Sequence, residues 1–156
     1  MSTAELPLID DIRAASRQMV RGLGFMEATL AATDYPPSAV HTILEIGIRG
    51  PMTSGEIAGF LHLEKSSVSR LVRKLVESGE LKEMSNAADA RVKPLALTAK
   101  GRRTLAALHE FGRRQVTGAL SRLTEAERRM VRDGLMLYAR ALNADRAAGT
   151  ELQAAS

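Results

Sequence analysis

The chain has 156 residues, of which 45% are hydrophobic but only 3% aromatic, and its formal net charge at pH 7 is +4. This length allows one domain with a hydrophobic core and an appendage, and so few aromatic residues favour a helical core of Leu, Ile, Val, Met and Ala. The absence of cysteine excludes disulfide bonds, thiolate metal sites and cysteine-based redox sensing. The sequence contains no recognisable signal peptide or bilayer-length apolar run, so we expect a cytoplasmic location and no membrane partner.

The positive charge is concentrated in the middle of the chain. Residues 51–104 contain ten basic and six acidic side chains, and their net charge equals that of the whole chain. Residues 1–50 contain four basic and six acidic side chains, and residues 105–156 contain eight and six. A basic centre between nearly neutral arms is typical of a module that binds a polyanion. On charge alone, a solvated surface without a partner is the alternative.

The N-terminal arm has the pattern of a long helix. Apolar or small residues recur at alternating spacings of three and four from Ile9 to Leu30, which predicts a coiled-coil-like seam. Gly22 and Gly24 interrupt this pattern and indicate a bend or a close helix contact. The prolines within 34–37 should end this helix and start a second, mostly buried helix.

The middle of the chain predicts two short helices. Thr53 and Glu56 form a capping box at the start of the first, and His62 lies in a tight turn after it. The second begins near Lys65 and should end at Gly79, which suits a helix C-cap. Its apolar residues lie one and two turns apart on one face: Val68, Leu71, Val72 and Leu75.

The remainder predicts a hairpin and two further helices. Two antiparallel strands are expected over 81–85 and 93–97, joined by a polar tip over 86–92, with Pro94 facing outward or at an edge. Thr98 should cap a long helix, and Thr124 with Glu127 should form a capping box before the last helix. The tail after Asn143 should fray. The predicted fold is therefore mainly α with a small β-hairpin wing, a winged helix-turn-helix with N- and C-terminal dimerisation helices.

The helix that begins near Lys65 has the side chains of a helix that reads DNA. Opposite its apolar side, small hydroxyls and basic groups can reach base edges or phosphates in the major groove. The short serines near its first turn allow a close approach, and the free amides there favour a phosphate. The candidate DNA-binding residues on this helix are Ser66, Ser67, Ser69, Arg70, Arg73 and Lys74. An ordinary solvated surface helix is the alternative, which its position between a helical turn and a basic hairpin disfavours.

The hairpin offers a second contact. Arg91 and Lys93 lie at or near its tip, and an arginine fits the strongly negative potential of a narrow minor groove. Asp89 lies two residues before Arg91, so both side chains can point to the same side of the ribbon. We expect Asp89 to orient the guanidinium, because a carboxylate facing phosphates is repelled. An exposed ion pair of little energetic value is the alternative.

With these residues the sequence resembles the MarR family of transcriptional regulators along nearly its whole length. The most specific parts are Ser-Ser-Val-Ser-Arg-Leu-Val-Arg-Lys-Leu at 66–75 and Asp89-x-Arg91, followed by Leu95-x-Leu97-Thr98-x-x-Gly101. The resemblance implies that residues 66–74 enter the major groove, that Arg91 enters the minor groove, and that N- and C-terminal helices intertwine in a dimer. Glu80-Leu81 departs from the family, which more often has an apolar pair there, and His62 replaces a usual turn glycine.

These patterns predict a homodimer that binds double-stranded DNA. Residues 1–34 and 104–146 should form the dimerisation region, 35–103 the DNA-binding domain, and 147–156 a flexible tail. Apolar residues on two faces of the last helix exceed the needs of one domain face, which favours a two-fold dimer on a pseudo-palindrome. The resemblance also implies a small-molecule effector pocket. The resemblance assigns no residues to this pocket, and Met19, Gly22, Gly24 and Met26 fit either a pocket wall or ordinary packing.

Three alternatives fit the sequence less well. A nonspecific architectural DNA-binding protein would need a broad basic surface, and the two arms together have no net charge. An enzyme would need a phosphate-binding glycine loop, a nucleophile with a base or a metal cluster, none of which the sequence has, so we predict no enzymatic activity and no cofactor. A metal site is not expected, since His41, His62 and His109 lack the short spacing of metal ligands.

Overall fold

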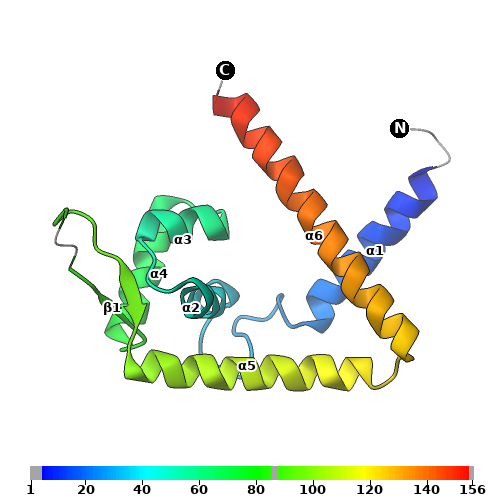
Figure 1. The fold of residues 1–156 in the computed structure, drawn as a ribbon, viewed down its shortest axis with the longest axis horizontal. Helices are drawn as coiled ribbons and strands as arrows, with labels where there is room; N and C mark the ends of the chain where they lie inside the picture. Colours follow the sequence, from blue (N-terminus) through cyan, green and yellow to red (C-terminus); the bar gives the residue numbers. More distant parts are fainter. Residues whose placement is uncertain (1–4, 86–87, 155–156) are drawn as a thin grey trace. The chain divides into compact units, whose positions relative to one another are not determined.

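The computed structural model describes residues 5–85 and 88–154, with eight elements in these ranges (Figure 1). They form two compact units, one up to Gly112 and one from Arg113 onward. The predicted class, mainly helical with one small antiparallel hairpin, is confirmed. In chain order the elements are α1 (Leu6–Gly22), α2 (Pro37–Arg49), α3 (Ser54–Leu61), α4 (Lys65–Glu77), β1 (Leu81–Glu83), β2 (Leu95–Leu97), α5 (Ala99–Leu120) and α6 (Glu125–Ala154).

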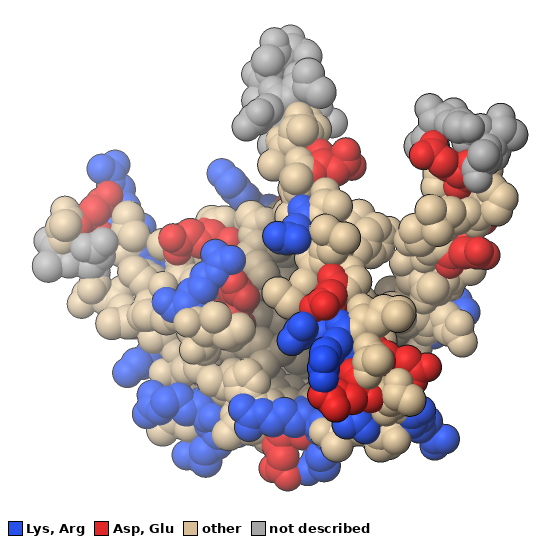
Figure 2. Space-filling model, turned by 45° about the vertical axis from the view of Figure 1, so that its right-hand side comes forward, with Lys and Arg blue, Asp and Glu red and all other residues tan. Residues whose placement is uncertain are grey.

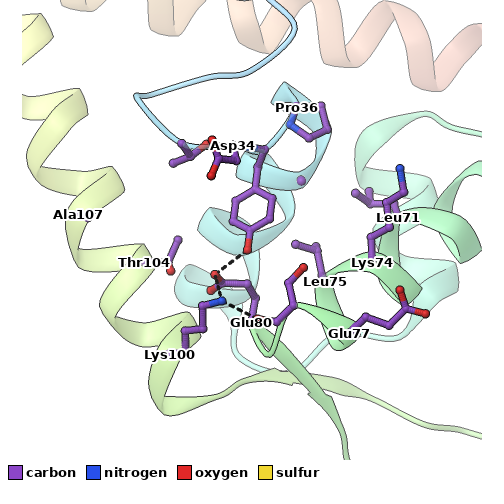
Figure 3. A pocket seen from close by; sticks show the side chains of 14 residues that line it. Asp34, Pro36, Leu71, Lys74, Leu75, Glu77, Glu80, Lys100, Thr104 and Ala107 are labelled. Atoms are coloured by element: carbon purple, nitrogen blue, oxygen red, sulfur yellow. Dashed lines mark hydrogen bonds and ion pairs between the residues drawn. The ribbon is translucent and has the colours of Figure 1, made fainter.

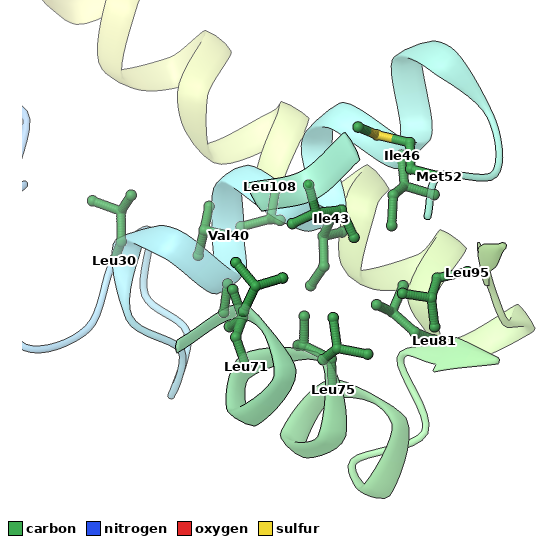
Figure 4. Close-up of a cluster of buried hydrophobic side chains, with 14 residues drawn as sticks. Leu30, Val40, Ile43, Ile46, Met52, Leu71, Leu75, Leu81, Leu95 and Leu108 are labelled. Atoms are coloured by element: carbon green, nitrogen blue, oxygen red, sulfur yellow. The ribbon is translucent and has the colours of Figure 1, made fainter. Parts of the chain in front are cut away.

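The core of the first unit lies between α2, α4, the hairpin and the first half of α5 (Figure 4). The apolar stripe of α4 is buried at all four predicted positions. Leu81 and Leu95 contribute from the two strands, and Leu108 contributes from α5. This shared core fixes the position of α4, so that its other face remains available to a partner.

The helix ends in this unit follow the predicted local chemistry. The side chain of Thr53 accepts a hydrogen bond from the Glu56 amide (3.2 Å), and the Glu56 carboxylate accepts one from the Thr53 amide (2.7 Å). His62 ends α3 with φ of 54°, in the left-handed region that histidine tolerates better than most residues. The capping box and the turn are therefore confirmed, and together they set the direction in which α4 leaves α3.

The hairpin is shorter than predicted. Its register pairs Leu81 with Leu97 and Glu83 with Leu95. The strand expected from residue 93 begins only at Leu95, because Pro94 has no N–H to donate to a ladder. Its carbonyl still accepts a 2.7 Å hydrogen bond from the amide of Met84, which extends the pairing by one bond.

The first helix ends earlier than predicted. α1 stops at Gly22, whereas the seam was expected to continue to Leu30 and the helix to end within 34–37. Gly24 has φ of 81°, which takes the chain out of the helix. Leu30 is instead buried in the core of the first unit, which accounts for its apolar character. Of the two expectations for these glycines, a bend or a close helix contact, Gly24 shows the bend, whereas a Cβ at Gly22 would meet no atom of the described residues within 4 Å.

The second unit contains the end of α5 and the whole of α6. The predicted capping box opens α6: the Thr124 amide donates to the Glu127 carboxylate (2.8 Å), and Thr124 Oγ1 accepts from the Glu127 amide (3.3 Å). The helix continues to Ala154, beyond Asn143 where we expected it to fray. All its side chains from residue 125 to 149 are exposed, including seven large apolar ones: Met130, Val131, Leu135, Met136, Leu137, Tyr138 and Leu142.

Candidate nucleic-acid interface

α4 separates its apolar and polar side chains onto opposite faces. The core holds one face, and the other carries hydroxyl and basic groups that face solvent or the groove beside the helix. Ser67 is half-buried, and the remaining five candidate residues are exposed: Ser66, Ser69, Arg70, Arg73 and Lys74. The structure thus brings all six predicted residues of this helix together in the first compact unit.

The start of α4 leaves backbone donors available. Glu64 lies at the N-cap and makes no side-chain capping hydrogen bond, although its carbonyl accepts from the amide of Val68 (3.1 Å). The first amides of a helix lack partners within the helix, and the helix dipole favours an anion beside them. The serines that follow are short enough to let a phosphate or a base edge approach this end.

A groove of about 540 Å³ runs beside α4. Ser67, Arg70 and Arg73 line one side of it, and Ser38 near the start of α2 lines the other. Sequence reasoning did not select Ser38 as a candidate contact. Its position directly after two prolines could have indicated it, because prolines favour the start of a helix. A serine in the first helical turn offers both a free backbone amide and a short hydroxyl.

The wing holds Arg91 through Asp89. Oδ1 of Asp89 accepts a hydrogen bond from the backbone amide of Arg91 (2.9 Å) and a longer one from its Nε (3.4 Å). The Arg91 side chain remains 93% exposed, so this contact guides the guanidinium without burying it. Residues 86 and 87 of the predicted tip lie outside the described residues.

Lys93 has a different environment from Arg91. Its ammonium lies 3.6 Å from the Glu83 carboxylate on the opposite strand. Both side chains are largely exposed, so the energy of this pair is small and the ammonium can still turn toward a phosphate. Lys93 therefore lies beside the hairpin ladder, whereas Arg91 projects from the tip.

The base of the wing is fixed by Thr98. Its amide donates to the Glu80 carbonyl (3.0 Å), and its hydroxyl donates to the Gly79 carbonyl. The same hydroxyl oxygen accepts from the Gly101 amide (3.0 Å), which makes Thr98 the predicted cap of α5. One side chain therefore joins the end of α4, the start of the wing and the start of α5.

Glu80, at the start of the wing, is a buried carboxylate that sequence reasoning noted only as a departure from the family pattern. The Tyr35 hydroxyl donates a 2.8 Å hydrogen bond to its Oε1. Burial of the phenol, together with this hydrogen bond, raises the pKa of Tyr35 above its ordinary value, which favours the protonated hydroxyl that makes this bond. Lys100 of α5 lies 3.7 Å from the same oxygen.

Positive charge does not cover the molecule uniformly. On the face drawn in Figure 2, basic and acidic side chains lie next to one another.

In residues 5–85 and 88–154, no three histidine or acidic side chains gather in a group able to hold a metal ion. Nor does any helix in these ranges have the length and apolar character needed to cross a membrane.

Comparison with known proteins identifies one sequence family. Residues 33–92, from the turn before α2 to the wing, match the model of the MarR family. This segment includes the whole exposed face of α4 and also Asp89 and Arg91. Comparison with curated proteins gives no match.

Several solved structures have the same fold as this chain. RV1404 from Mycobacterium tuberculosis has a TM-score of 0.74 at 20% identity, covering 92% of this chain and 96% of its own. Streptococcus pneumoniae FabT, solved in complex with DNA, has a TM-score of 0.72 at 23% identity, with coverages of 88% and 97%. MepR, a transcription regulator of the Staphylococcus aureus multidrug efflux pump MepA, has a TM-score of 0.65 at 21% identity, with coverages of 91% and 99%.

Proposed function

Because the chain belongs to the MarR family of DNA-binding transcriptional regulators, which are not enzymes, we propose that it is a dimeric, sequence-specific repressor. In this proposal it binds a pseudo-palindromic operator in the cytoplasm, and a small-molecule effector releases it. The comparison with FabT supports the DNA-binding part, because that protein shares the fold and was solved in complex with DNA.

The observation that carries sequence-specific binding is the exposed face of α4. Ser66, Arg70 and Arg73 lie opposite a stripe that the core holds in place. An arginine can donate two hydrogen bonds to guanine O6 and N7 in the major groove, and serine can contact bases or phosphates. We propose that Ser66, Ser67, Ser69, Arg70, Arg73 and Lys74 bind the major groove and its phosphates.

The wing would supply the second contact of each half-site. Arg91 is largely exposed and is guided by Asp89, an arrangement that suits insertion of its guanidinium into a narrow minor groove. Lys93 would contribute a phosphate contact beside it. Base reading by α4 and shape reading by Arg91 would then act on adjacent grooves of the same half-site.

The exposed apolar residues of α1 and α6 support pairing of two copies. Ile12 on α1 is 39% exposed, and Leu135 and Leu142 on α6 are 43% and 51% exposed. Val131, Leu135, Tyr138 and Leu142 recur at the spacing of a helical seam, and such a face is stable in water when another apolar face covers it. Two DNA-reading helices related by a two-fold axis would fit half-sites about 34 Å apart.

Selection of bound sites from random DNA tests this function. The expected product is an inverted repeat whose half-sites lie about one helical turn apart. Recovery of DNA without a consensus, together with a steep salt dependence, would instead support the alternative of a nonspecific architectural protein. Candidate effectors added to the same binding reaction test relief of binding.

Sedimentation tests the dimer separately. The native chain is expected to sediment as a dimer at micromolar concentration, and Leu135→Glu should shift it to monomer. Ile48→Glu is the matched control, since Ile48 is 72% exposed but lies on α2 in the first unit. A stable monomer of the native chain at this concentration would contradict the proposal.

A further inference from the structure

A cavity of about 800 Å³ opens in the first compact unit (Figure 3). The turn before α2, the second half of α4 and the first half of α5 enclose it. Ala39, Leu71, Leu75 and Ala107 give it apolar walls. Its size falls within the ~300–1,000 Å³ of typical small-molecule sites, which combine such walls with a few polar groups that fix orientation.

Among the charged residues that line this cavity, Glu80 is the buried one. Its side chain is only 2% exposed. Oε1 accepts the hydrogen bond from Tyr35, whereas Oε2 is buried and has no hydrogen-bond partner among the described residues. A buried carboxylate oxygen without a donor is unfavourable, so a ligand that brings an N–H to Oε2 would gain a charge-assisted hydrogen bond.

The charges around the cavity favour a cation over an anion. Three carboxylates line it, from Asp34, Glu77 and Glu80, against the ammonium groups of Lys74 and Lys100. The Lys100 ammonium already donates to the Ser78 carbonyl (2.6 Å) and lies near Oε1 of Glu80. An anionic ligand would therefore meet a buried carboxylate beside a lysine that is already engaged.

We propose that this cavity binds a small organic cation, an ammonium or amidinium group on an apolar body, which donates an N–H to Oε2 of Glu80. The apolar body contacts Leu71 and Leu75 on the wall that α4 provides. Because α4 also carries the proposed DNA-reading side chains, one of which (Lys74) lines the cavity, occupancy of the cavity biases the position of that helix. The proposed binding of the cation depends only on the cavity, whereas its effect on DNA binding rests on the proposed function.

Three probes with the same ring test the charge preference. Benzamidine is cationic, benzamide is its neutral counterpart and benzoate is anionic. Titration followed by two-dimensional amide NMR should show benzamidine shifting the amides of Tyr35, Leu75 and Glu80, with benzamide and benzoate binding at least about tenfold more weakly. Equal or tighter binding of benzoate or benzamide overturns the proposal, as does the absence of shifts at these three amides.

Two variants test the role of Glu80. Glu80→Gln removes the charge at nearly constant shape and should weaken benzamidine binding about tenfold or more. Glu64→Gln is the matched control, an exposed carboxylate that does not line the cavity, and should bind benzamidine like the native chain. Equal benzamidine affinity in Glu80→Gln and the native chain overturns the assignment.

Tyr35→Phe keeps the proposal testable if Glu80→Gln does not fold. This variant removes the hydroxyl that donates to Oε1 and leaves the carboxylate in place. Benzamidine binding should then be retained or strengthened, because the carboxylate has lost a donor. Loss of benzamidine binding in folded Tyr35→Phe would overturn the assignment of the Glu80 carboxylate alone as the recognition group.

DNA binding is measured in parallel, so that the two proposals can fail independently. Benzamidine titrations without DNA test the cavity alone. Operator affinity with and without saturating benzamidine tests coupling, with weaker operator binding expected in its presence. Unchanged operator affinity in saturating benzamidine would overturn the coupling between the cavity and DNA binding, but not the cation site itself. Failure to select any operator would overturn the proposed function.

Discussion

Gly101 on α5 packs directly against the backbone of Glu80 at the base of the wing. A Cβ at this position would come closer than van der Waals contact to the Glu80 carbonyl oxygen and would also touch Leu97. The same carbonyl accepts the hydrogen bond from the Thr98 amide, so it cannot move away freely. The wing is thus seated on α5 through a contact that only glycine permits.

Gly101→Ala should therefore destabilise the protein. The expected loss is about 1–3 kcal/mol in the free energy of unfolding, because the added methyl group displaces backbone and not a flexible side chain. Gly112→Ala on the same helix is the control, since a Cβ there meets nothing within 4 Å. It should be neutral or stabilising by up to about 1 kcal/mol, as expected for a helical glycine. Equal stabilities in urea titrations would contradict this account of the wing base.

Arg70 and Arg73 should determine affinity and base preference at the operator. Arg70→Ala or Arg73→Ala is expected to cost about 1–3 kcal/mol and to relax the preference at one position of each half-site. Arg13→Ala is a matched control, because Arg13 is an exposed arginine on α1 that pairs with Asp10 (3.1 Å). Fluorescence anisotropy on the selected operator and on single-base variants measures both effects. Unchanged operator affinity in both α4 variants would rule out base reading by these residues.

Arg91 should contribute to operator affinity directly, and Asp89 should contribute only through Arg91. Arg91→Ala is expected to weaken binding most at operators with A/T-rich flanks, with little change in preference at the positions that α4 reads. Asp89→Ala should produce a smaller loss, since it removes the acceptor that guides the guanidinium. The double variant should then resemble Arg91→Ala alone, because Asp89 acts only through Arg91. Additive losses in the double variant would show that the two residues act independently.

Local chemistry made much of this fold predictable. Both capping boxes, the turn at His62 and the buried stripe of α4 depend on residues within one or two turns of each other, and all are present. What could not be predicted depends on distant contacts. Leu30 continued the apolar spacing of the first helix, but its apolar character serves the core of the first unit. Glu80 is buried through Tyr35, a partner 45 positions away that no sequence spacing reveals.

His41 should make stability depend on pH. Burial lowers its pKa below the ordinary value of 6.5, and the negative charge of Glu45 only partly opposes this. Its ring lies 5.4 Å from the ring of Phe25, measured between centroids, so that protonation would place a charge beside an apolar partner. In this environment the native state therefore binds a proton less readily than the unfolded chain does.

The sign of the effect follows from this difference. Below about pH 6.5 the unfolded chain takes up a proton at His41 that the native state resists, so the free energy of unfolding falls as the pH decreases from about 7.5 toward 5.5. His41→Phe should retain the contact with Phe25 and reduce this slope, because phenylalanine does not titrate. Glu45→Gln removes the negative charge that partly raises the pKa of His41 in the native state. The loss of stability should then extend to lower pH. Urea titrations across this pH range measure how the free energy of unfolding changes with pH. If the native chain shows as little change as His41→Phe, His41 is not the source of the pH dependence.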